Sequence, residues 1–450
     1  MKKVITYGTY DLLHYGHVRL LERAKALGDY LIVGVTADDF DKTRGKINVK
    51  QSLMERVEAV RSTGVADEII IEEYEGQKID DIRRYDVDIF TVGSDWLGKF
   101  DYLNNYCKVI YLDRTEGVSS SEIRAQENFT KLGLVGDVTL VKKYYNESLY
   151  VNCVCVKAVY TQNRDIADFV ENNNIEVADD FDTLLTEVDA VYIASIPTMH
   201  YEQVKKAINA GKHVLCESPI SLREEECKEL FDLSRNKNVI LMEAIKTAYS
   251  TAYNRLLLLL KGGKIGDILS VDATCTSLLN VAVNSTNNLW NSINGWGPTA
   301  LLPIFQIIGI NYNNKNIVSW IEEPDSNFDL FTKIDFTYSN AVATLKVGKG
   351  VKSEGELIIS GTKGYVYVPA PWWKTDYFEV RFENSEQNKR YFYQLDGEGI
   401  RYTIVALMKS IETGKTNTYI DEKISEKIAS IIESFYSRKD MQIISCNNHE

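Results

Sequence analysis

The chain has 450 residues, carries a formal charge of −13 and is 44% hydrophobic. This length allows about two to three domains of roughly 100–200 residues each, and this hydrophobic content excludes disorder as the main state. The acidic balance argues against a protein that coats nucleic acid or an anionic membrane.

The seven cysteines are irregularly spaced and predict free thiols rather than a disulfide framework. The N-terminal segment is too short and too polar for the core of a signal peptide. The longest leucine run, residues 256–260, is far shorter than the ~20 apolar residues that span a bilayer. We therefore expect a cytoplasmic protein with no membrane span.

The first 130 residues alternate predicted strands with predicted helices. Strands are predicted at residues 4–7, 30–35, 68–71, 89–92 and 109–112, and helices at residues 18–27, 55–62 and 79–85. Strands separated by helices are typical of parallel βαβ units. Residues 1–130 are therefore expected to form an α/β domain of the Rossmann-like type.

The rest of the chain divides into two segments that differ in predicted secondary structure. Residues 131–247 repeat the alternation, with strands at 133–136, 151–160, 190–195, 213–216 and 239–242, and helices at 164–172, 201–210 and 224–237. Residues 248–450 contain β-branched alternation at 268–276, 328–337, 341–347, 356–360, 365–368 and 377–382, between helices at 253–261 and 402–411. The sequence predicts a second Rossmann domain followed by an α+β domain with an antiparallel sheet.

The sharpest motif runs from Gly8 to Leu21, where a predicted strand enters a glycine turn and His14 and His17 open a helix. Gly8 and Gly16 let a phosphate approach the backbone, and a helix start adds N–H groups and partial positive charge. Fixed donors of this kind suit nucleotidyl transfer, in which a phosphate oxygen displaces pyrophosphate from an α-phosphorus. The alternative is a pair of histidines that cap or pack by chance.

Three segments carry a resemblance to a known family: residues 8–21, residues 92–101 (VGSDWLGKFD) and residues 114–121 (RTEGVSSS). Through them residues 1–126 resemble the glycerol-3-phosphate cytidylyltransferases of the HxGH nucleotidyltransferase superfamily. The resemblance implies CTP as the donor, a polyol phosphate such as glycerol 3-phosphate as the acceptor, and Mg²⁺ that arrives with CTP, with no separate metal site. It also implies a homodimer and a CDP-alcohol, such as CDP-glycerol, that feeds teichoic acid or capsule synthesis.

The resemblance also implies roles for individual residues. His14, His17, Lys46 and Arg114 would be catalytic, and Arg44 and Lys78 would hold the acceptor phosphate. The other CTP-binding positions would be Gly8, Thr9, Tyr10, Asp11, Tyr15, Gly16, Asp95, Trp96, Thr115, Gly117, Val118, Ser119, Ser120 and Ser121. Tyr10 replaces the usual phenylalanine, and two serines replace two threonines, which are mild departures. Each basic residue could instead be a solvated surface charge.

Residues 131 to about 440 resemble the Gfo/Idh/MocA family of NAD(P)-dependent oxidoreductases. Residues 188–194 (VDAVYIA), 197–200 (PTMH), 210–217 (AGKHVLCE) and 242–244 (MEA) carry this resemblance. It implies a Rossmann fold, NAD(P) as cofactor and a second site that contains Gly136, His200, Glu217 and Lys246.

Several positions of this second site depart from the family pattern. Val138 stands where a glycine lets the backbone approach the pyrophosphate, and Asp137 adds a negative charge beside it. Ser218 replaces the lysine of the E-K-P motif, and serine is not a general acid near pH 7. Lys246 could substitute for the missing lysine. The fold thus suggests that the second site binds NAD(P), whereas the altered residues argue against NAD(P) binding.

Three hypotheses follow. The first is a CTP:polyol-phosphate cytidylyltransferase whose C-terminal part is a degenerate oxidoreductase that binds a ligand or builds an oligomer. The second is a bifunctional enzyme whose C-terminal domain also reduces a keto-sugar phosphate. The third is a non-catalytic assembly protein. Retention of His14, His17 and Arg114 favours an enzyme.

Overall fold

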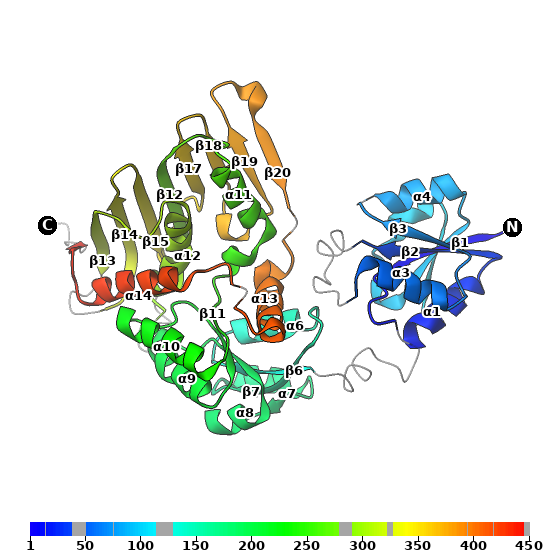
Figure 1. Ribbon diagram of the computed structural model, residues 1–450, viewed down its shortest axis with the longest axis horizontal. Coiled ribbons are helices and arrows are strands. Elements are labelled where there is room, and N and C mark those ends of the chain that lie inside the picture. The colour runs from blue at the N-terminus through cyan, green and yellow to red at the C-terminus, as the bar shows by residue number, and fades with distance from the viewer. Residues whose placement is uncertain are drawn as a thin grey trace. The chain divides into compact units, whose positions relative to one another are not determined.

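The computed structural model describes residues 1–13, 15–37, 51–74, 76–113, 129–278, 290–321, 327–393, 395–416 and 418–444, without the side chain of residue 95. The chain forms two compact units (Figure 1). The first contains Met1–Phe129 and Tyr150–Cys153, and the second contains Thr130–Leu149 and Val154–Glu450. The further division of the second unit at residue 247 stays a prediction.

The first unit is built on a five-stranded sheet of order β3-β2-β1-β4-β5, in which every pair is parallel. Its strands are β1 (Lys3–Gly8), β2 (Tyr30–Thr36), β3 (Glu68–Glu72), β4 (Ile89–Gly93) and β5 (Lys108–Leu112). Its helices are α1 (Tyr15–Lys25), α3 (Leu53–Ser62) and α4 (Gln77–Tyr85), with 3-10 turns η1 (Ser94–Trp96) and η2 (Asp101–Asn105). The predicted parallel α/β arrangement is confirmed.

Helices cover both faces of this sheet because alternate strand residues point to opposite sides. Val4 of β1 packs with residues of α1 and α3, whereas its neighbour Ile5 packs with Ile82 of α4. In the sheet, β1 lies between β2 and β4. The chain passes from β1 to β2 and β3 on one side, and then crosses to β4 and β5 on the other side. The carboxyl end of β1 is therefore a topological switch point, where ligands of open α/β sheets bind.

The second unit contains a six-stranded parallel sheet of order β11-β10-β9-β6-β7-β8. The strands are β6 (Thr130–Val135), β7 (Val154–Tyr160), β8 (Glu176–Val177), β9 (Ala190–Ile193), β10 (His213–Cys216) and β11 (Leu241–Glu243). The helices are α6 (Leu140–Ser148), α7 (Arg164–Glu171), α8 (Phe181–Glu187), α9 (Pro197–Asn209) and α10 (Glu224–Lys237). The second Rossmann domain is confirmed. The short helices α6 and α8 were not predicted.

A larger mixed sheet of order β20-β19-β18-β17-β12-β15-β14-β13-β21 follows, with β16 (Gly350–Val351) paired to β12. Its main strands are β12 (Ile268–Leu278), β13 (Asn314–Ile321), β14 (Asp329–Thr337), β15 (Val342–Gly348), β17 (Leu357–Gly361), β18 (Tyr365–Val368), β19 (Tyr377–Arg381), β20 (Lys389–Phe392) and β21 (Met441–Ile444). The helices of this region are η3 (Lys246–Tyr249), α11 (Thr251–Lys261), α12 (Ser292–Ile307), η5 (Trp372–Lys374), η6 (Ser385–Gln387), η7 (Gly397–Gly399), α13 (Ile400–Thr413) and α14 (Glu422–Tyr436).

The predicted antiparallel pairing holds for most of this sheet, but two neighbouring pairs, β12 with β15 and β13 with β21, are parallel. Parallel neighbours need a long crossover. Between β12 and β15 that crossover includes α12 and the hairpin of β13 and β14. Helix α12 was missed because it contains Pro298 and Pro303 and is buried on most sides, so it lacks an amphipathic pattern.

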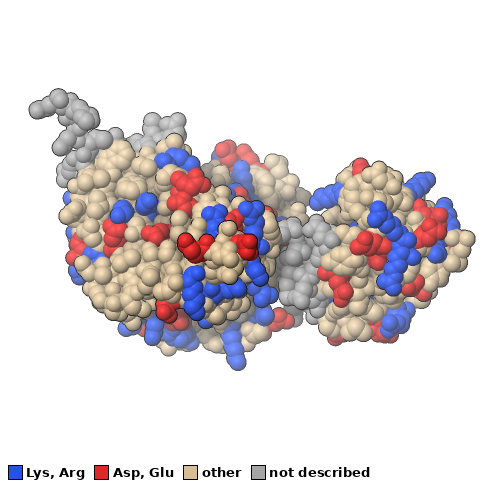
Figure 2. Space-filling model, turned by 90° about the horizontal axis from the view of Figure 1, so that it is seen from above, with Lys and Arg blue, Asp and Glu red and all other residues tan. Residues whose placement is uncertain are grey.

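The surface carries both signs of charge. On the face shown in Figure 2, Lys and Arg side chains are interspersed with Asp and Glu side chains and with uncharged residues. Within the described ranges, no helix combines the length and the apolar character needed to cross a membrane.

Candidate functional site

The carboxyl end of β1 brings the glycine turn and one histidine of the motif together. A Cβ added to Gly8 would lie 2.9 Å from the Tyr10 ring, so only glycine fits there without displacing that ring. Tyr10 and Leu12 adopt positive φ angles of 55° and 46°, which fold the segment back over the strand. The buried Tyr10 ring meets the His17 ring edge-on at 5.7 Å between centroids.

His17 lies in the first turn of α1, directly after this turn. Helix starts carry partial positive charge and favour phosphate groups. No acidic residue lies in the first turn of α1 to oppose that preference. His14 lies outside the described residues, so its predicted position beside His17 stays a prediction.

Arg56 is the buried residue that fixes the ends of two strands, and the sequence analysis missed it. Its side chain on α3 is fully buried, and Nη1 donates to the carbonyl oxygens of Thr9 at 2.7 Å and Thr36 at 2.8 Å. Its Nε donates to the carbonyl oxygen of Gln51 at 3.2 Å. These bonds tie the carboxyl ends of β1 and β2 to the start of α3.

Two further bonds hold the turn after Tyr10. The backbone N–H of Gln51 donates to Asp11 Oδ1 at 3.0 Å, and the side chain of Gln51 accepts from Leu12 N at 2.8 Å. Asp11, one of the predicted CTP-binding residues, is thus part of the framework of the turn.

Lys78 lies inside the first unit. Its side chain is 4% exposed, its ammonium forms an ion pair with Glu72, and it lies 4.4 Å from the centroid of the Tyr7 ring. The Tyr7 hydroxyl donates to Asp81 at 2.8 Å, and burial raises the pKa of Tyr7 above its usual range. A direct contact between Lys78 and an acceptor phosphate would require the Glu72 pair to open, and that role stays a prediction.

Trp96 follows β4 in η1, is 41% exposed and has the Lys99 ammonium 5.0 Å from its ring. Tyr15 begins α1 and is 58% exposed. The predicted residues that lie outside the described ranges are His14, Arg44, Lys46, Arg114, Thr115, Gly117, Val118, Ser119, Ser120 and Ser121. Among the described residues, no group of three or more histidine, cysteine, aspartate or glutamate side chains could hold a metal ion.

In the second unit, Glu217 follows β10 and accepts a hydrogen bond from the Tyr192 hydroxyl at 2.7 Å. Burial raises the pKa of Glu217 to about 7, against the lowering effects of the Tyr192 bond and of the Lys246 ammonium. Burial also lowers the pKa of Lys246, while the Glu217 carboxylate raises it. The structure therefore brings Glu217 and Lys246 into one electrostatic environment.

His200 and Ser218 have structural partners. The His200 ring is fully buried between the carbonyl oxygens of Pro219 and Ser195, at 2.7 Å and 2.8 Å from its two nitrogens. Burial lowers the pKa of His200, against the raising effect of the two carbonyl oxygens. The Ser218 hydroxyl donates to the buried Glu243 carboxylate, so this replacement for lysine is directed at a core carboxylate.

Asp137 follows Gly136 at the carboxyl end of β6. Its Oδ1 accepts from Thr161 Oγ1 at 2.9 Å and from the N–H groups of Gln162 and Asn163 at 2.6 Å and 3.2 Å. Gly136 adopts a φ of 137°, and a Cβ there would lie 2.5 Å from the Ala194 carbonyl oxygen. Asp137 thus joins the loop after β6 to the loop after β7.

Comparisons with known proteins fit this geometry. The family model described as cytidylyltransferase-like matches residues 5–126. The glycerol-3-phosphate cytidylyltransferase of Bacillus spizizenii is 52% identical over 124 residues, which are 28% of this chain and 95% of that protein. The chain belongs to the cytidylyltransferase-like family through its first unit. The Bacillus subtilis protein of the same name is 48% identical to this cytidylyltransferase-like unit over 126 residues, 28% of this chain and 97% of that protein.

The second unit carries a Gfo/Idh/MocA oxidoreductase domain. The model described as an oxidoreductase family with an NAD-binding Rossmann fold matches residues 132–245. An uncharacterized oxidoreductase of Synechocystis is 35% identical over 143 residues, 30% of this chain and 37% of that protein, so the chain spans about a third of this relative. A 3-ketoreductase from Actinomadura kijaniata, solved with NADP and TDP-benzene, shares the fold with a TM-score of 0.63 and 18% identity, over 71% of this chain and 100% of that one.

This domain has the fold of NAD(P)-binding proteins, and two residues at its phosphate turn depart from the usual dinucleotide-binding pattern. In Rossmann folds the second glycine of the turn admits the pyrophosphate, and the loop after the second strand binds the adenosine ribose or its 2′-phosphate. Here Val138 stands at that glycine, and the Asp137 carboxylate takes the donors of the loop after β7. Arg164, the first residue of α7 after that loop, forms an ion pair with Asp168 at 2.8 Å.

Replacing Arg56 by methionine should destabilise the cytidylyltransferase-like unit. The carbonyls of Thr9 and Thr36 would lose a buried charged donor, worth about 1.5–3 kcal/mol for each bond. We expect the calorimetric transition of this unit in the full chain to fall by about 10 °C. Arg61→Met, on the exposed side of the same helix, is the control and should change little. Equal shifts in the two variants would contradict the role given to Arg56.

Replacing Glu217 by glutamine should change how stability depends on pH. The folded carboxyl has a pKa near 7 and the unfolded one near 4.5, so the folded state binds more protons between these values and stability falls as pH rises through them. Between pH 5 and pH 8, the melting temperature of the wild type should therefore fall by about 5 °C more than that of Glu217→Gln. The exposed-site control, Glu225→Gln, should follow the wild type, and a Glu217→Gln curve parallel to the wild type would refute the raised pKa.

Proposed function

We propose that the first unit transfers CMP from CTP to a small polyol phosphate, such as glycerol 3-phosphate, and releases pyrophosphate. The observation that carries the proposal is the turn at the carboxyl end of β1, where Gly8, Tyr10 and His17 meet at a helix start. The named relatives, nearly all of whose length this unit matches, support the same activity. Synthesis of a CDP-alcohol for a cell-envelope polymer is part of the proposal.

The reaction forms one phosphorus–oxygen bond and breaks another. An oxygen of the acceptor phosphate attacks the α-phosphorus of CTP, and the bond to the bridging oxygen of the β-phosphate breaks as pyrophosphate leaves. Charge accumulates on the non-bridging oxygens, where His14, His17 and the start of α1 would donate. In this proposal Arg114 and Lys46 hold the triphosphate, and Arg44 and Lys78 attract the acceptor phosphate.

Mg²⁺ belongs to the proposed substrate complex. A divalent cation that arrived with CTP would neutralise charge on the leaving pyrophosphate. Polyphosphate oxygens and water are its preferred ligands, so it can enter with CTP.

A second candidate function is reduction of a keto-sugar phosphate by the second unit. The match to an NAD-binding oxidoreductase family favours it. Val138, the engaged Asp137 carboxylate and the loss of lysine at Ser218 oppose it. We therefore propose cytidylyl transfer as the activity of the chain, with the second unit serving as a ligand-binding or homodimer-forming body.

Replacing His14 by alanine should lower the rate of pyrophosphate release from CTP, Mg²⁺ and glycerol 3-phosphate by about 100- to 1000-fold, because one fixed donor to the transition state is lost. Arg19→Ala is the matched control, since Arg19 lies on α1 and pairs with Glu22 on the surface. Repeating the assay with a panel of polyol phosphates identifies the acceptor. Near-wild-type turnover by His14→Ala would exclude the proposed activity.

Titration of the full chain with NADPH, followed by cofactor fluorescence, separates the two candidates. We expect no saturable binding in the micromolar range, because Asp137 and Val138 occupy positions that the phosphates need. The variant Asp137→Gly with Val138→Gly should gain binding. Saturable micromolar binding by the wild type would favour the bifunctional enzyme.

A further inference from the structure

Three lysines of the second unit converge on one carboxylate. Lys143 of α6 lies 3.0 Å, Lys374 of η5 3.1 Å and Lys246 of η3 3.9 Å from Glu398 Oε2. We call Lys143, Lys246 and Lys374 the lysine cluster. The side chains of the cluster are 48%, 24% and 37% exposed, and that of Glu398 is 37% exposed, so solvent and solutes reach them.

The cluster has an excess of positive charge. Three ammonium groups face the Glu398 carboxylate, and burial raises the pKa of neighbouring Glu217 to about 7, so this second carboxyl is only partly ionised near neutral pH. Arg401 and Glu147 beside the cluster neutralise each other at 2.8 Å. In a chain with a net charge of −13, such an excess is a local arrangement and not a general property of the surface. A single carboxylate leaves it only partly compensated.

The backbone holds Glu398 in an unfavourable conformation. Glu398 has a φ of 54° between Gly397 at 55° and Gly399 at 83°. A Cβ at Gly397 would overlap the Glu147 carboxylate, so that side chain would have to move to make room for it. A glutamate in the left-handed region is less stable than a glycine would be. The ion pairs with the three lysines act in the folded state alongside this cost.

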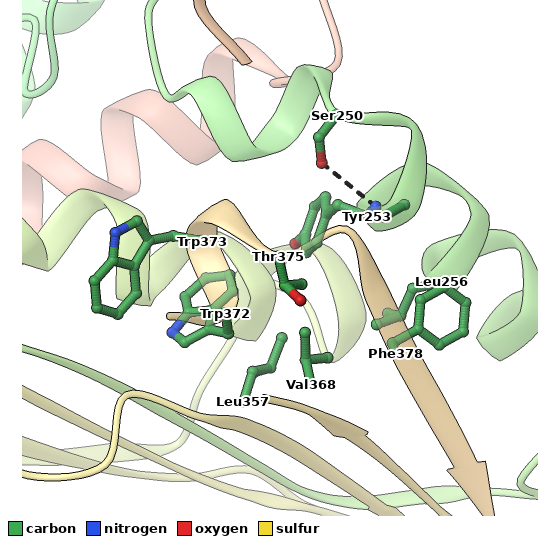
Figure 3. Close-up of a pocket in the computed structure, with 10 residues that line it drawn as sticks. Ser250, Tyr253, Leu256, Leu357, Val368, Trp372, Trp373, Thr375 and Phe378 are labelled. Atoms are coloured by element: carbon green, nitrogen blue, oxygen red, sulfur yellow. Dashed lines mark hydrogen bonds between the residues drawn. The ribbon is translucent and has the colours of Figure 1, made fainter. Parts of the chain in front are cut away.

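The turn that carries Lys374 is hydrogen-bonded to strand β12. Trp372, two residues before Lys374, donates from Nε1 to the Thr274 carbonyl oxygen at 3.1 Å. The cavity beneath η5, lined by Tyr253, Leu357 and Trp372 among others, measures about 10 Å³ and has room for about one water molecule (Figure 3). The turn that carries Lys374 is therefore held to the large sheet, which limits the positions from which its side chain reaches Glu398.

We propose that Lys143, Lys246 and Lys374 bind the phosphate group of a small phosphorylated molecule and that the Glu398 carboxylate occupies the cluster until this phosphate replaces it. A phosphomonoester carries about −1.5 to −2 charge near neutral pH and matches the excess better than one carboxylate does. This site lies in the second unit and does not depend on CMP transfer by the first.

Hydrogen exchange of the full chain, measured by mass spectrometry with glycerol 3-phosphate as the probe, tests the proposal. Peptides that cover residues 372–376 and 395–402 report on the lysine cluster alone, so binding to the first unit registers elsewhere. We expect these peptides to change exchange on addition of the probe. Lys374→Ala and Lys143→Ala should raise the half-effective concentration about tenfold, and Glu398→Gln should lower it about tenfold.

The controls distinguish the possible sources of the phosphate. Lys363→Ala removes an exposed lysine between β17 and β18 and should behave as the wild type. Inorganic phosphate should act only at higher concentration than glycerol 3-phosphate, and equal action would reduce the cluster to an unspecific anion site and overturn the proposal. The proposal also fails if NADPH acts on these peptides at lower concentration, or if the probe acts equally on wild type and Lys374→Ala.

Discussion

The geometry of the first site depends on the hydrogen bonds that the buried guanidinium of Arg56 donates. Parallel strands end with carbonyl groups that have no partner in the sheet, and buried carbonyls need a donor. Arg56 supplies one charged donor to the ends of both β1 and β2. With Thr9 held in this way, Tyr10 can turn back over Gly8 and pack against His17. The buried charge of Arg56 thus positions the turn after β1, which the sequence motif suggests without showing what holds it in place.

In the second unit the roles are reversed, because carboxylates of the chain accept bonds from donors that lie after the strands. At the end of β6, Asp137 accepts from the N–H groups of the loop after β7. Beyond β10, Ser218 donates to the buried Glu243, which also accepts from Ser425 at 2.5 Å. Where an oxidoreductase of this fold would present donors and a lysine to a cofactor, this chain has closed internal contacts. In both places a carboxylate of the chain accepts the bonds of nearby donors.

Local pattern predicted most of the elements, because their signals lie within a few turns of chain. The strands of both Rossmann sheets follow apolar runs, and the Gly8–His17 motif marked the switch point. The parallel pairing of β12 with β15 could not be predicted, because it depends on where α12 and a hairpin carry the chain. Arg56 offered a weak signal: it lies one turn before the buried Val60 on α3, so a charge falls on an apolar face.

The lysine cluster had no local signal at all, because Lys143, Lys246 and Lys374 come from three elements far apart in the sequence. Although Ser218 stands where the family pattern has a lysine, the lysine cluster still provides positive charge in the second unit. Lys246 is coupled to Glu217, in the segment that lost the lysine, and the other two lysines extend the positive region toward Glu398. A lysine that donates a proton must lie at the reacting atom, whereas lysines that hold a phosphate need only surround it. The three lysines around Glu398 have the arrangement that the second requirement describes.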